Sequence, residues 1–398
     1  MPAISMNDTR VEEVLGELWR WCQERDFAGY DPYDALNSRV FAVTPFQKFG
    51  GSRLLFTQLV KRSPVNLRTV LGVPAEVNSK GIALFSLAAL SKYRRLKTSS
   101  AEQQAGELLA RLLEIRLHGY SGVAWGYNFD WQSRNFFAPR GTPTIVPTAF
   151  AVRALTEAFE MFGDRAYLDA ARSVCEFVTT DLKRTVETDD ELCFSYSPLD
   201  HTRIFNATLF AGEILATVSR LTGEDELCNL ATKTARYVVR NQQGDGSWNY
   251  GAATSQSWKD NFHTAYVLQS LSRIIKCCPS VENEFRPAWE RGVNYWRATF
   301  FLADGWPKYY HDALYPADAH SAATAIVTLA ELSEVDKTAL PLANRIASWT
   351  INNLRHSKGF FYYQRRRFHT IRVPFMRWTQ AWMAYAFARL TEAQQVAK

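Results

Sequence analysis

The sequence has no apolar run long enough to cross a membrane and no recognisable export signal. Its longest apolar stretches, such as Ile82 to Leu90, are far below the ~20 residues needed to span a bilayer. The first ten residues contain neither a basic region nor an apolar region of the kind that directs secretion. We therefore expect a soluble protein without a transmembrane segment, located in the cytoplasm.

Several short motifs of common enzyme classes are also missing. There is no glycine-rich phosphate loop, no GxSxG nucleophile motif and no HExxH zinc motif, so nucleotide-dependent transfer and serine or zinc hydrolysis have no support. The net charge is only +6, from 46 Lys and Arg against 40 Asp and Glu, which lacks the basic density of a nucleic-acid binder. We expect no nucleic-acid partner and no cofactor.

Cysteine is scarce and irregularly spaced. None of the six residues forms a CxxC pair, and two of them are neighbours in sequence: Cys22, Cys175, Cys193, Cys228, Cys277 and Cys278. Zinc sites need ligands paired at suitable spacing, which are absent here. We therefore expect free thiols in a reducing compartment and no metal site.

Apolar and aromatic residues, in contrast, are plentiful. Hydrophobic residues make up 47% of the 398 residues and charged residues 22%, enough to build a large globular core. Aromatic residues reach 14%, with 12 Trp, 17 Tyr and 25 Phe. Aromatic side chains beyond the needs of a core often line concave sites that hold ring-shaped ligands.

A helical segment that is apolar nearly all round recurs six times. Successive copies start 69, 59, 55, 60 and 58 residues apart, near Asn78, Pro147, Asn206, Asn261, Ser321 and Thr379. Helices apolar on most faces are buried. More charged, amphipathic segments with one polar face alternate with them: Asp8–Arg25, Ala101–Leu117, Asp164–Leu182, Glu224–Asn241, Glu282–Ala298 and Leu340–Leu354.

This alternation predicts an all-α fold, a single-domain (α/α)6 toroid of six inner and six outer helices over residues 1–398. Aromatic residues alternate in the long loops that precede inner helices, as in Trp125-Gly126-Tyr127 and Trp248-Asn249-Tyr250, mostly after a glycine. Such a pattern predicts short β-hairpins. Because all inner helices of a toroid run the same way, these loops should gather at one end and form the site.

Three segments resemble known families. Asn241–Trp248 is similar to the QW repeat of terpenoid cyclases, and the repeated helices resemble the six-hairpin glycosidase and terpenoid-cyclase toroids. Gly29–Ser38 and Pro374–Trp382 resemble uncharacterised proteins of bacterial polysaccharide-biosynthesis clusters. The resemblance implies a toroid that handles either a carbohydrate or an isoprenoid.

Isoprenoid chemistry has weak support among the residues. A class II terpenoid cyclase needs a DxDD acid, and the nearest match, Thr188-Asp189-Asp190-Glu191, lacks that spacing. Zinc prenyltransferases of this architecture need Asp, Cys and His ligands, and Cys193 is the one cysteine expected near the site. An isoprenoid toroid therefore stays as an alternative.

Glycoside cleavage needs two carboxylates about 5–10 Å apart. The loops supply Asp31, Asp34, Asp130, Asp200, Asp260 and Asp318. Asp130 lies among aromatics that could raise its pKa toward that of a general acid, although a turn Asp that caps amides is the simpler interpretation. Asp260 and Asp318 directly precede inner helices, where an N-cap is the simplest role and catalysis the alternative.

His263 and His320 follow these two acids in the first turn of adjacent inner helices, where an imidazole could move a proton. Tyr127 and Tyr363 in the aromatic loops are further candidates for proton transfer. A lone histidine is usually structural, so the matched positions suggest a role without establishing one.

The last repeat is strongly basic. From Arg355 to Thr391 there is no Asp or Glu, and several arginines follow the last aromatic loop: Arg365, Arg366, Arg367, Arg372 and Arg377. Arginine binds carboxylates and phosphates in a bidentate manner, so these residues predict an anionic ligand. A solvated basic loop or a contact with an anionic membrane is the alternative.

The remaining substrate-binding candidates are one basic and four aromatic residues of the loops: Trp125, Arg134, Trp248, Trp306 and Tyr309. Sugar rings can pack on such aromatic side chains, although the same rings could simply fill gaps between hairpins.

Together these features predict an enzyme that acts on an acidic oligosaccharide or glycolipid in bacterial polysaccharide metabolism. Glycoside hydrolysis would use Asp130 as acid with Asp260 or Asp318 as base, whereas a lyase or C5-epimerase would move the proton alpha to a uronic carboxylate. The alternatives are an isoprenoid toroid and a non-catalytic glycan-binding protein. Peripheral contact with a membrane is compatible with either carbohydrate hypothesis.

Overall fold

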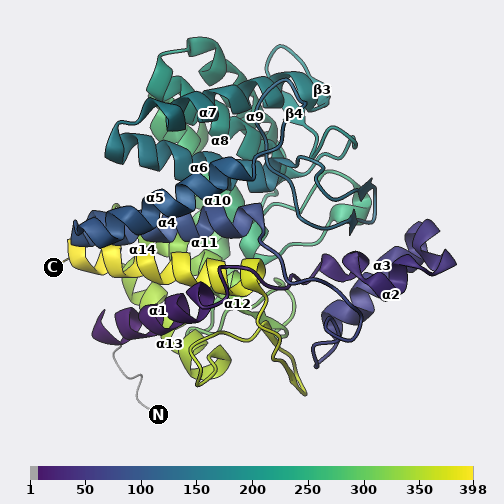
Figure 1. The fold of residues 1–398 in the computed structure, drawn as a ribbon. Coiled ribbons are helices and arrows are strands. Elements are labelled where there is room, and N and C mark those ends of the chain that lie inside the picture. The colour runs from purple at the N-terminus through teal and green to yellow at the C-terminus, as the bar shows by residue number, and fades with distance from the viewer. Residues whose placement is uncertain (1–7, 398) are drawn as a thin grey trace. The chain divides into compact units, whose positions relative to one another are not determined.

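The computed structural model describes residues 8–397, and it contains a helix at each of the twelve predicted positions (Figure 1). The inner helices are α4 (Ser79–Leu96), α6 (Ile145–Phe162), α8 (Phe205–Thr222), α10 (Asn261–Cys277), α12 (Ala319–Leu332) and α14 (Trp382–Val396). The outer helices are α1 (Asp8–Gln23), α5 (Ser99–Glu114), α7 (Arg165–Glu176), α9 (Asp225–Arg240), α11 (Glu282–Phe300) and α13 (Ala339–Leu354). No helix in the described part of the chain is long and apolar enough to cross a membrane.

The chain forms two compact units. Unit 1 comprises the described residues of Met1–Arg111, Tyr127–Gly141 and Phe301–Lys398, and unit 2 comprises Leu112–Gly126 and Thr142–Phe300. In unit 1, α14 packs against α4, α12 and α1. In unit 2, α8 packs against α6, α9 and α10.

A buried charge network ties together the three inner helices of unit 2. Arg153 on α6 donates from Nε and Nη2 to the two carboxylate oxygens of Glu213 on α8, both at 2.6 Å. Its Nη1 donates to Gln269 on α10, and Ser270 donates to Glu213. Burial would raise the pKa of Glu213, but the Arg153 guanidinium holds it below its ordinary value. Such a network is stable only while each buried charge keeps its partner.

The loops contain short antiparallel hairpins, as the aromatic repeats predicted. β1 (Trp131–Gln132) pairs with β2 (Phe137–Ala138), and β3 (Arg184–Glu187) pairs with β4 (Leu192–Phe194). A third sheet has the order β5-β6-β7, formed by Ala317–Asp318, Gln364–Arg365 and Thr370–Ile371. This sheet joins the start of α12 to the basic loop before α14.

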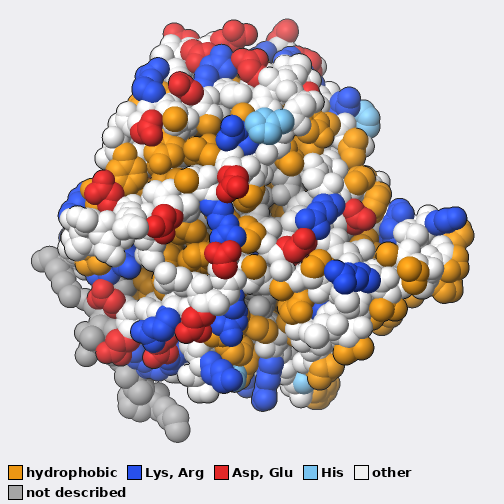
Figure 2. Space-filling model, in the orientation of Figure 1, with side chains coloured by type: hydrophobic (Ala, Val, Ile, Leu, Met, Phe, Trp, Pro, Cys, Tyr) orange, Lys and Arg blue, Asp and Glu red, His pale blue; other side chains and the backbone are white. Residues whose placement is uncertain are grey.

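A helical segment between α1 and α4 lies outside the predicted repeat. It contains η1 (Asp34–Asn37), α2 (Arg39–Ala42), η2 (Pro45–Lys48) and α3 (Gly50–Arg62). In unit 1, α2 and α3 stand apart from α1, α12, α13 and α14 (Figure 1). Hydrophobic side chains cover much of this projection (Figure 2).

The expectation that every cysteine is free is wrong for one pair. Cys228 on α9 forms a disulfide with Cys278, the residue that caps α10. Their Cα atoms lie 6.3 Å apart because α9 and α10 are neighbours in unit 2. Sequence spacing could not reveal this pair, since 50 residues separate the two positions.

The buried network yields a stability prediction. Replacing Glu213 by Leu leaves the Arg153 charge buried without its carboxylate, so the free energy of unfolding should fall by about 3–5 kcal/mol. The double variant Arg153→Met/Glu213→Leu should recover most of that loss, because it removes both charges. Urea denaturation measures both changes.

The exposed pair Arg220–Glu160 provides the control for this experiment. Its atoms are as close, at 2.6 Å, but both side chains are at least 40% exposed. Glu160→Leu should therefore cost less than about 1 kcal/mol. Equal losses from Glu213→Leu and Glu160→Leu would contradict the assigned role of the network.

Candidate functional site

Two carboxylates and two arginines pair in a buried cluster in unit 1. Arg377 donates to both oxygens of Asp31, from Nε at 2.6 Å and from Nη2 at 2.8 Å. Arg68 donates from Nε to Asp34 at 2.6 Å, and burial raises the pKa of Asp34 to about 6. A small hollow lies beside this cluster, lined by Gly29, Tyr30, Asp31, Asp34, Asn37, Pro74, Glu76, Asn78, Asn128, Met376 and Arg377.

This pairing corrects the expected role of Arg377. We expected its guanidinium to bind an anionic ligand, but Asp31 already neutralises it, and the Arg377 side chain is only 3% exposed. The cluster joins the segment that follows α1 to the π-helical turn η6 (Met376–Ala381) that precedes α14. Its main effect is to hold together two loops that lie far apart in sequence.

Asp318 is fully buried at the N-terminus of α12. Its Oδ1 accepts hydrogen bonds from the backbone N–H groups of His320 and Ser321, and its Oδ2 accepts one from Gln364 Nε2 at 3.0 Å. The Trp378 indole lies 3.4 Å from Oδ1. Burial raises the pKa of Asp318 to about 6, against an ordinary value of 3.8. Asp318 is thus the N-cap of α12.

The positive charge of Lys61 on α3 acts on Asp318 and lowers the pKa of its carboxyl in opposition to burial. Lys61 was not among the predicted site residues. Its Nζ donates to Tyr33 Oη at 2.7 Å and lies 4.0 Å above the Tyr33 ring. Burial lowers the pKa of Lys61 to about 8, while Asp318 and Asp31 oppose that shift. Nothing in the repeat pattern pointed to Lys61, because it lies on a helix outside the repeats.

Asp260 and His263 form the corresponding acid–histidine pair in unit 2. Asp260 caps α10 by accepting from the His263 backbone N–H at 2.9 Å, and its Oδ2 lies 2.7 Å from His263 Nδ1. Because an ionised carboxylate only accepts hydrogen bonds, this contact favours the tautomer in which Nδ1 is the donor, and in a neutral ring Nε2 then keeps its lone pair. The Asp260 side chain is 1% exposed and that of His263 is 23% exposed, so the imidazole is accessible while its partner is not.

Two aromatic residues that the site prediction omitted complete this cluster. Trp258 donates its indole N–H to Asp260 Oδ2 at 3.1 Å. Tyr250 stacks on Trp258 with ring centroids 4.5 Å apart, and its ring lies 4.5 Å from the imidazole of His263. The recurring aromatic loop contained Tyr250, which was the available signal, whereas Trp258 lay outside the repeated pattern.

The structure does not pair His320 with Asp318 in this way. The imidazole of His320 is fully buried, and its Nδ1 lies 3.1 Å from the carbonyl oxygen of Trp378. It packs against the rings of Trp378 and Trp382. The matched sequence positions of the two histidines therefore give one accessible imidazole and one interior imidazole.

Asp130 closes the β1–β2 hairpin. Its Oδ1 accepts from the backbone N–H of Arg140 at 2.7 Å, which is the turn-capping geometry weighed above as the simpler interpretation. Tyr127 in the same segment stacks on Phe129 and lies 5.0 Å below the Arg377 guanidinium. Arg134 is exposed in the hairpin turn.

The tryptophans expected to bind sugar rings are largely buried. Trp125 has no exposed surface and donates to the Leu112 carbonyl, and Trp248 is 2% exposed and donates to the Val238 carbonyl. Neither ring face is available to a sugar, so a stacking role for these two residues is wrong. Trp306 is 9% exposed and packs against Trp349, while Tyr309 is half-buried beside Tyr310.

The other basic residues of the last repeat lie on the β6–β7 hairpin and its flanks. Arg365 donates to Asn353, and its guanidinium lies 5.5 Å from the Trp306 ring centroid. Arg366 has a buried Nε without a hydrogen-bond partner among the described residues, and Arg367 and Arg372 are exposed. Tyr363, which directly precedes this hairpin, is buried, and its pKa is raised well above the ordinary value by burial.

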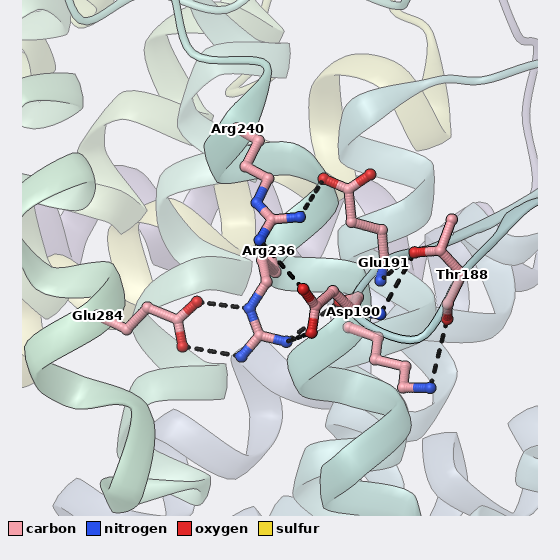
Figure 3. Close-up of polar contacts among 7 residues, drawn as sticks. Thr188, Asp190, Glu191, Arg236, Arg240 and Glu284 are labelled. Carbon is pink, nitrogen blue, oxygen red and sulfur yellow. Dashed lines mark hydrogen bonds and ion pairs between the residues drawn. The ribbon is translucent and has the colours of Figure 1, made fainter.

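The nearest match to the cyclase acid motif also has a structural role. Asp190 and Glu191 lie in the β3–β4 turn, where Arg236 and Arg240 of α9 point toward them (Figure 3). Glu284 on α11 binds the other side of Arg236. The two acids of the turn are therefore paired with arginines of α9. No group of three or more His, Cys, Asp or Glu within the described residues is placed to hold a metal ion.

No protein-family model and no curated protein match the sequence. Solved structures do match the fold. A possible member of the GH105 family from Salmonella enterica has 12% identity and a TM-score of 0.63, covering 100% of this chain and 97% of that chain. An unsaturated glucuronyl hydrolase specific for heparin has 13% identity and a TM-score of 0.62, covering 98% and 97%. A cellobiose 2-epimerase from Bacillus thermoamylovorans has 15% identity and a TM-score of 0.62, covering 81% and 90%.

The fold is the (α/α)6 toroid. The matched structures all have this six-hairpin architecture, so the predicted fold class and the resemblance to six-hairpin toroids are confirmed.

The environment of Asp318 predicts how stability depends on pH. Its pKa is higher in the folded protein than the ordinary value of 3.8, so the folded state binds more protons between pH 4 and 6. Its stabilising contribution is complete below pH 4 and is lost as the pH rises through about 6, by up to about 3 kcal/mol. Asp34 has the same sign.

Asp318→Asn should therefore reduce the fall in unfolding free energy between pH 4 and 6, measured by urea denaturation at a series of pH values. Asp312→Asn, at a position where the side chain is 71% exposed, is the control and should leave the slope unchanged. An unchanged slope for Asp318→Asn would show that Asp318 titrates normally.

Proposed function

We propose that this protein is a carbohydrate-active enzyme in which His263 transfers a proton to or from a sugar. The known proteins that share its fold include a hydrolase of unsaturated glucuronyl substrates and an epimerase of cellobiose. The Asp260–His263 pair is the observation that carries the proposal, because it joins a buried carboxylate to a solvent-accessible imidazole at 2.7 Å.

The pair has the properties that a general base requires. Asp260 fixes the tautomer and the orientation of the ring, which leaves Nε2 free to accept a proton. When the ring becomes an imidazolium, the carboxylate stabilises its positive charge. Trp258 and the backbone N–H of His263 hold the Asp260 carboxylate in place, and Tyr250 and Trp258 present stacked rings beside the base.

The reaction that fits is proton abstraction from a carbon next to a carbonyl or carboxylate. The C–H bond breaks, Nε2 takes the proton, and the electron pair moves into the carbonyl or carboxylate as an enol or enolate. Return of the proton on the other face gives an epimer, whereas loss of the glycosidic oxygen as leaving group gives an unsaturated product. In the elimination the imidazolium gives its proton to the departing glycosidic oxygen, and in the epimerisation the enolate must turn over at His263 before the same proton returns to its other face.

The finer part of the proposal concerns the substrate. Arg366, with its unpartnered buried Nε, and the exposed Arg367 and Arg372 would form an anion site within unit 1 that takes the carboxylate or phosphate of an acidic oligosaccharide or glycolipid. Trp306, Tyr309 and Arg365 are the neighbouring candidates for sugar contacts. Bacterial polysaccharide metabolism and a cytoplasmic location belong to the same proposal.

Glycoside hydrolysis is the second candidate, and the environment of Asp318 favours it. Burial raises the pKa of its carboxyl to about 6, which is the direction a general acid requires, and this role needs the buried side chain to become accessible to the sugar. Lys61 interacts electrostatically with Asp318, and burial lowers the pKa of Lys61 to about 8. Under this alternative, activity depends on Asp318 and does not require His263.

Hydrogen exchange in D2O separates the two candidates. The protein is incubated with neutral and uronic disaccharides, and NMR follows loss of the C–H signal next to the carbonyl or carboxylate. The wild type should exchange this hydrogen, and His263→Gln should slow the exchange by about 100-fold or more, as expected for loss of a general base. His201→Gln, an exposed histidine of the same unit, is the matched control.

Hydrolysis without exchange, lost in Asp318→Asn and kept in His263→Gln, would reject the proton-transfer proposal and support the second candidate. Binding without any turnover would favour the non-catalytic alternative.

The arginine hairpin gives an independent prediction. Arg366→Gln/Arg367→Gln should weaken binding of a uronic oligosaccharide by about tenfold, because loss of a charge-assisted contact costs roughly 1.5 kcal/mol, and should leave binding of the neutral analogue unchanged. Isothermal titration calorimetry with both ligands measures the difference. Equal effects on the two substrates would contradict recognition of an acidic group by this hairpin.

A further inference from the structure

Residues 39–70 of unit 1 form a projecting segment, here called the arm, that contains α2, η2 and α3. Nine of the large apolar side chains that are exposed among the described residues lie on the arm, and nine are spread over all the rest. The arm residues are Val40, Val43, Phe46, Phe49, Leu55, Leu59, Val65, Leu67 and Val70. Exposed apolar patches of this density mark surfaces that bind something.

The exposed residues share one side of α3. Leu55, Leu59 and Arg62 follow helical spacing and are exposed, at 61% and 62% for the two leucines, whereas Thr57 and Val60 on the other side are buried. Helix α3 therefore has an apolar face that the described part of the protein leaves uncovered. Figure 2 shows hydrophobic side chains and basic side chains together on the projection.

The arm is a folded platform, because its other side has its own core and anchors. Phe41 and Phe56 stack with centroids 4.2 Å apart, and Ser38 caps α2. The buried Arg68–Asp34 ion pair fixes the end of the arm. Phe46 and Phe49 lie outside this small core and are 60% and 63% exposed.

The turn that carries these two phenylalanines is tied to α3. The single hydroxyl proton of Ser52 lies between the carbonyl oxygens of Phe46 and Phe49 and is shared by them, and Arg53 donates to the Gln47 carbonyl. The backbone of this turn is thus tied to the first turn of α3.

The charge of the arm has one sign. Between Ala35 and Ala75 the sequence contains six Lys and Arg residues and no Asp or Glu. Arg53, Lys61 and Arg68 bind within the protein, whereas Arg39, Lys48 and Arg62 are exposed next to the apolar residues. An apolar face bordered by basic side chains matches the interface of an anionic lipid bilayer, where apolar groups enter the acyl boundary and cations contact the headgroups.

We propose that the arm docks on anionic lipid membranes, with Phe46, Phe49, Leu55 and Leu59 inserted at the interface and Lys48 and Arg62 on the headgroups. This proposal does not depend on the reaction assigned above. A second copy of the chain fits the arm poorly: a twofold interface would place the arm against itself, and the basic residues would face each other with no acid in between.

Vesicle flotation with the full chain tests the proposal. The probes are vesicles of phosphatidylcholine alone and of phosphatidylcholine with phosphatidylserine. The wild type should float with the anionic vesicles and not with the neutral ones, and high salt should weaken binding. Phe46→Ser/Phe49→Ser should lower the partition coefficient by about tenfold or more, since each ring loses its apolar burial. Lys48→Glu/Arg62→Glu should lower it to a similar extent.

Leu314→Ser/Val335→Ser is the matched control, because it removes two exposed apolar side chains of the same unit outside the arm. It should bind as the wild type does, and circular dichroism should show that all variants are folded. Unchanged flotation of the arm variants, equal binding to neutral vesicles, or no binding by the wild type would overturn the proposal. A dimer seen by light scattering, and lost in Phe46→Ser/Phe49→Ser, would assign the arm to self-association instead.

Discussion

The cost of removing charged side chains from water is the constraint on which the rest of this structure depends. Arg153 and Glu213 satisfy it among the inner helices of unit 2, and Arg377 with Asp31 and Arg68 with Asp34 satisfy it in the loops of unit 1. Each pair joins segments that are far apart in sequence. A buried charge is tolerated here because a partner from a distant segment neutralises it. Each pair therefore requires its two segments to lie together.

The same constraint explains why the candidate groups differ in chemistry. Asp260 is buried next to an accessible imidazole, and the two share a proton-bearing hydrogen bond. Asp318 is buried among amides and an indole without such a partner, and its pKa rises to about 6. Two acids at matched positions before inner helices thus acquire different properties, because their neighbours differ.

The repeat made most of the fold predictable. Apolar segments at near-regular spacing identified all the inner helices, and the amphipathic segments between them identified the outer ones. The N-cap positions of Asp260 and Asp318 were predictable as well, because a helix N-cap depends on local sequence. The arm was not predictable, because it lies outside the repeat and has its own packing.

Pairing across long sequence distances was equally hidden. Nothing local distinguishes Arg377, which binds Asp31, from Arg367, which is exposed, and both lie in one basic stretch. Trp125 and Trp248 repeat as ligand-binding aromatics would, but their indole N–H groups bind backbone carbonyls in the interior. Burial is set by the tertiary structure, so a repeated aromatic position cannot by itself indicate a platform for sugars.

The tautomer of His263 tests the central claim most directly, namely that Asp260 prepares this imidazole to accept a proton. Long-range ¹H–¹⁵N NMR of the protein, with His263→Gln to assign the signals, reports which ring nitrogen carries hydrogen. Our account predicts a protonated Nδ1 and an unprotonated Nε2 at a pH where the ring is neutral. A ring protonated on Nε2 would contradict it, because the accessible nitrogen would then be unable to act as a base.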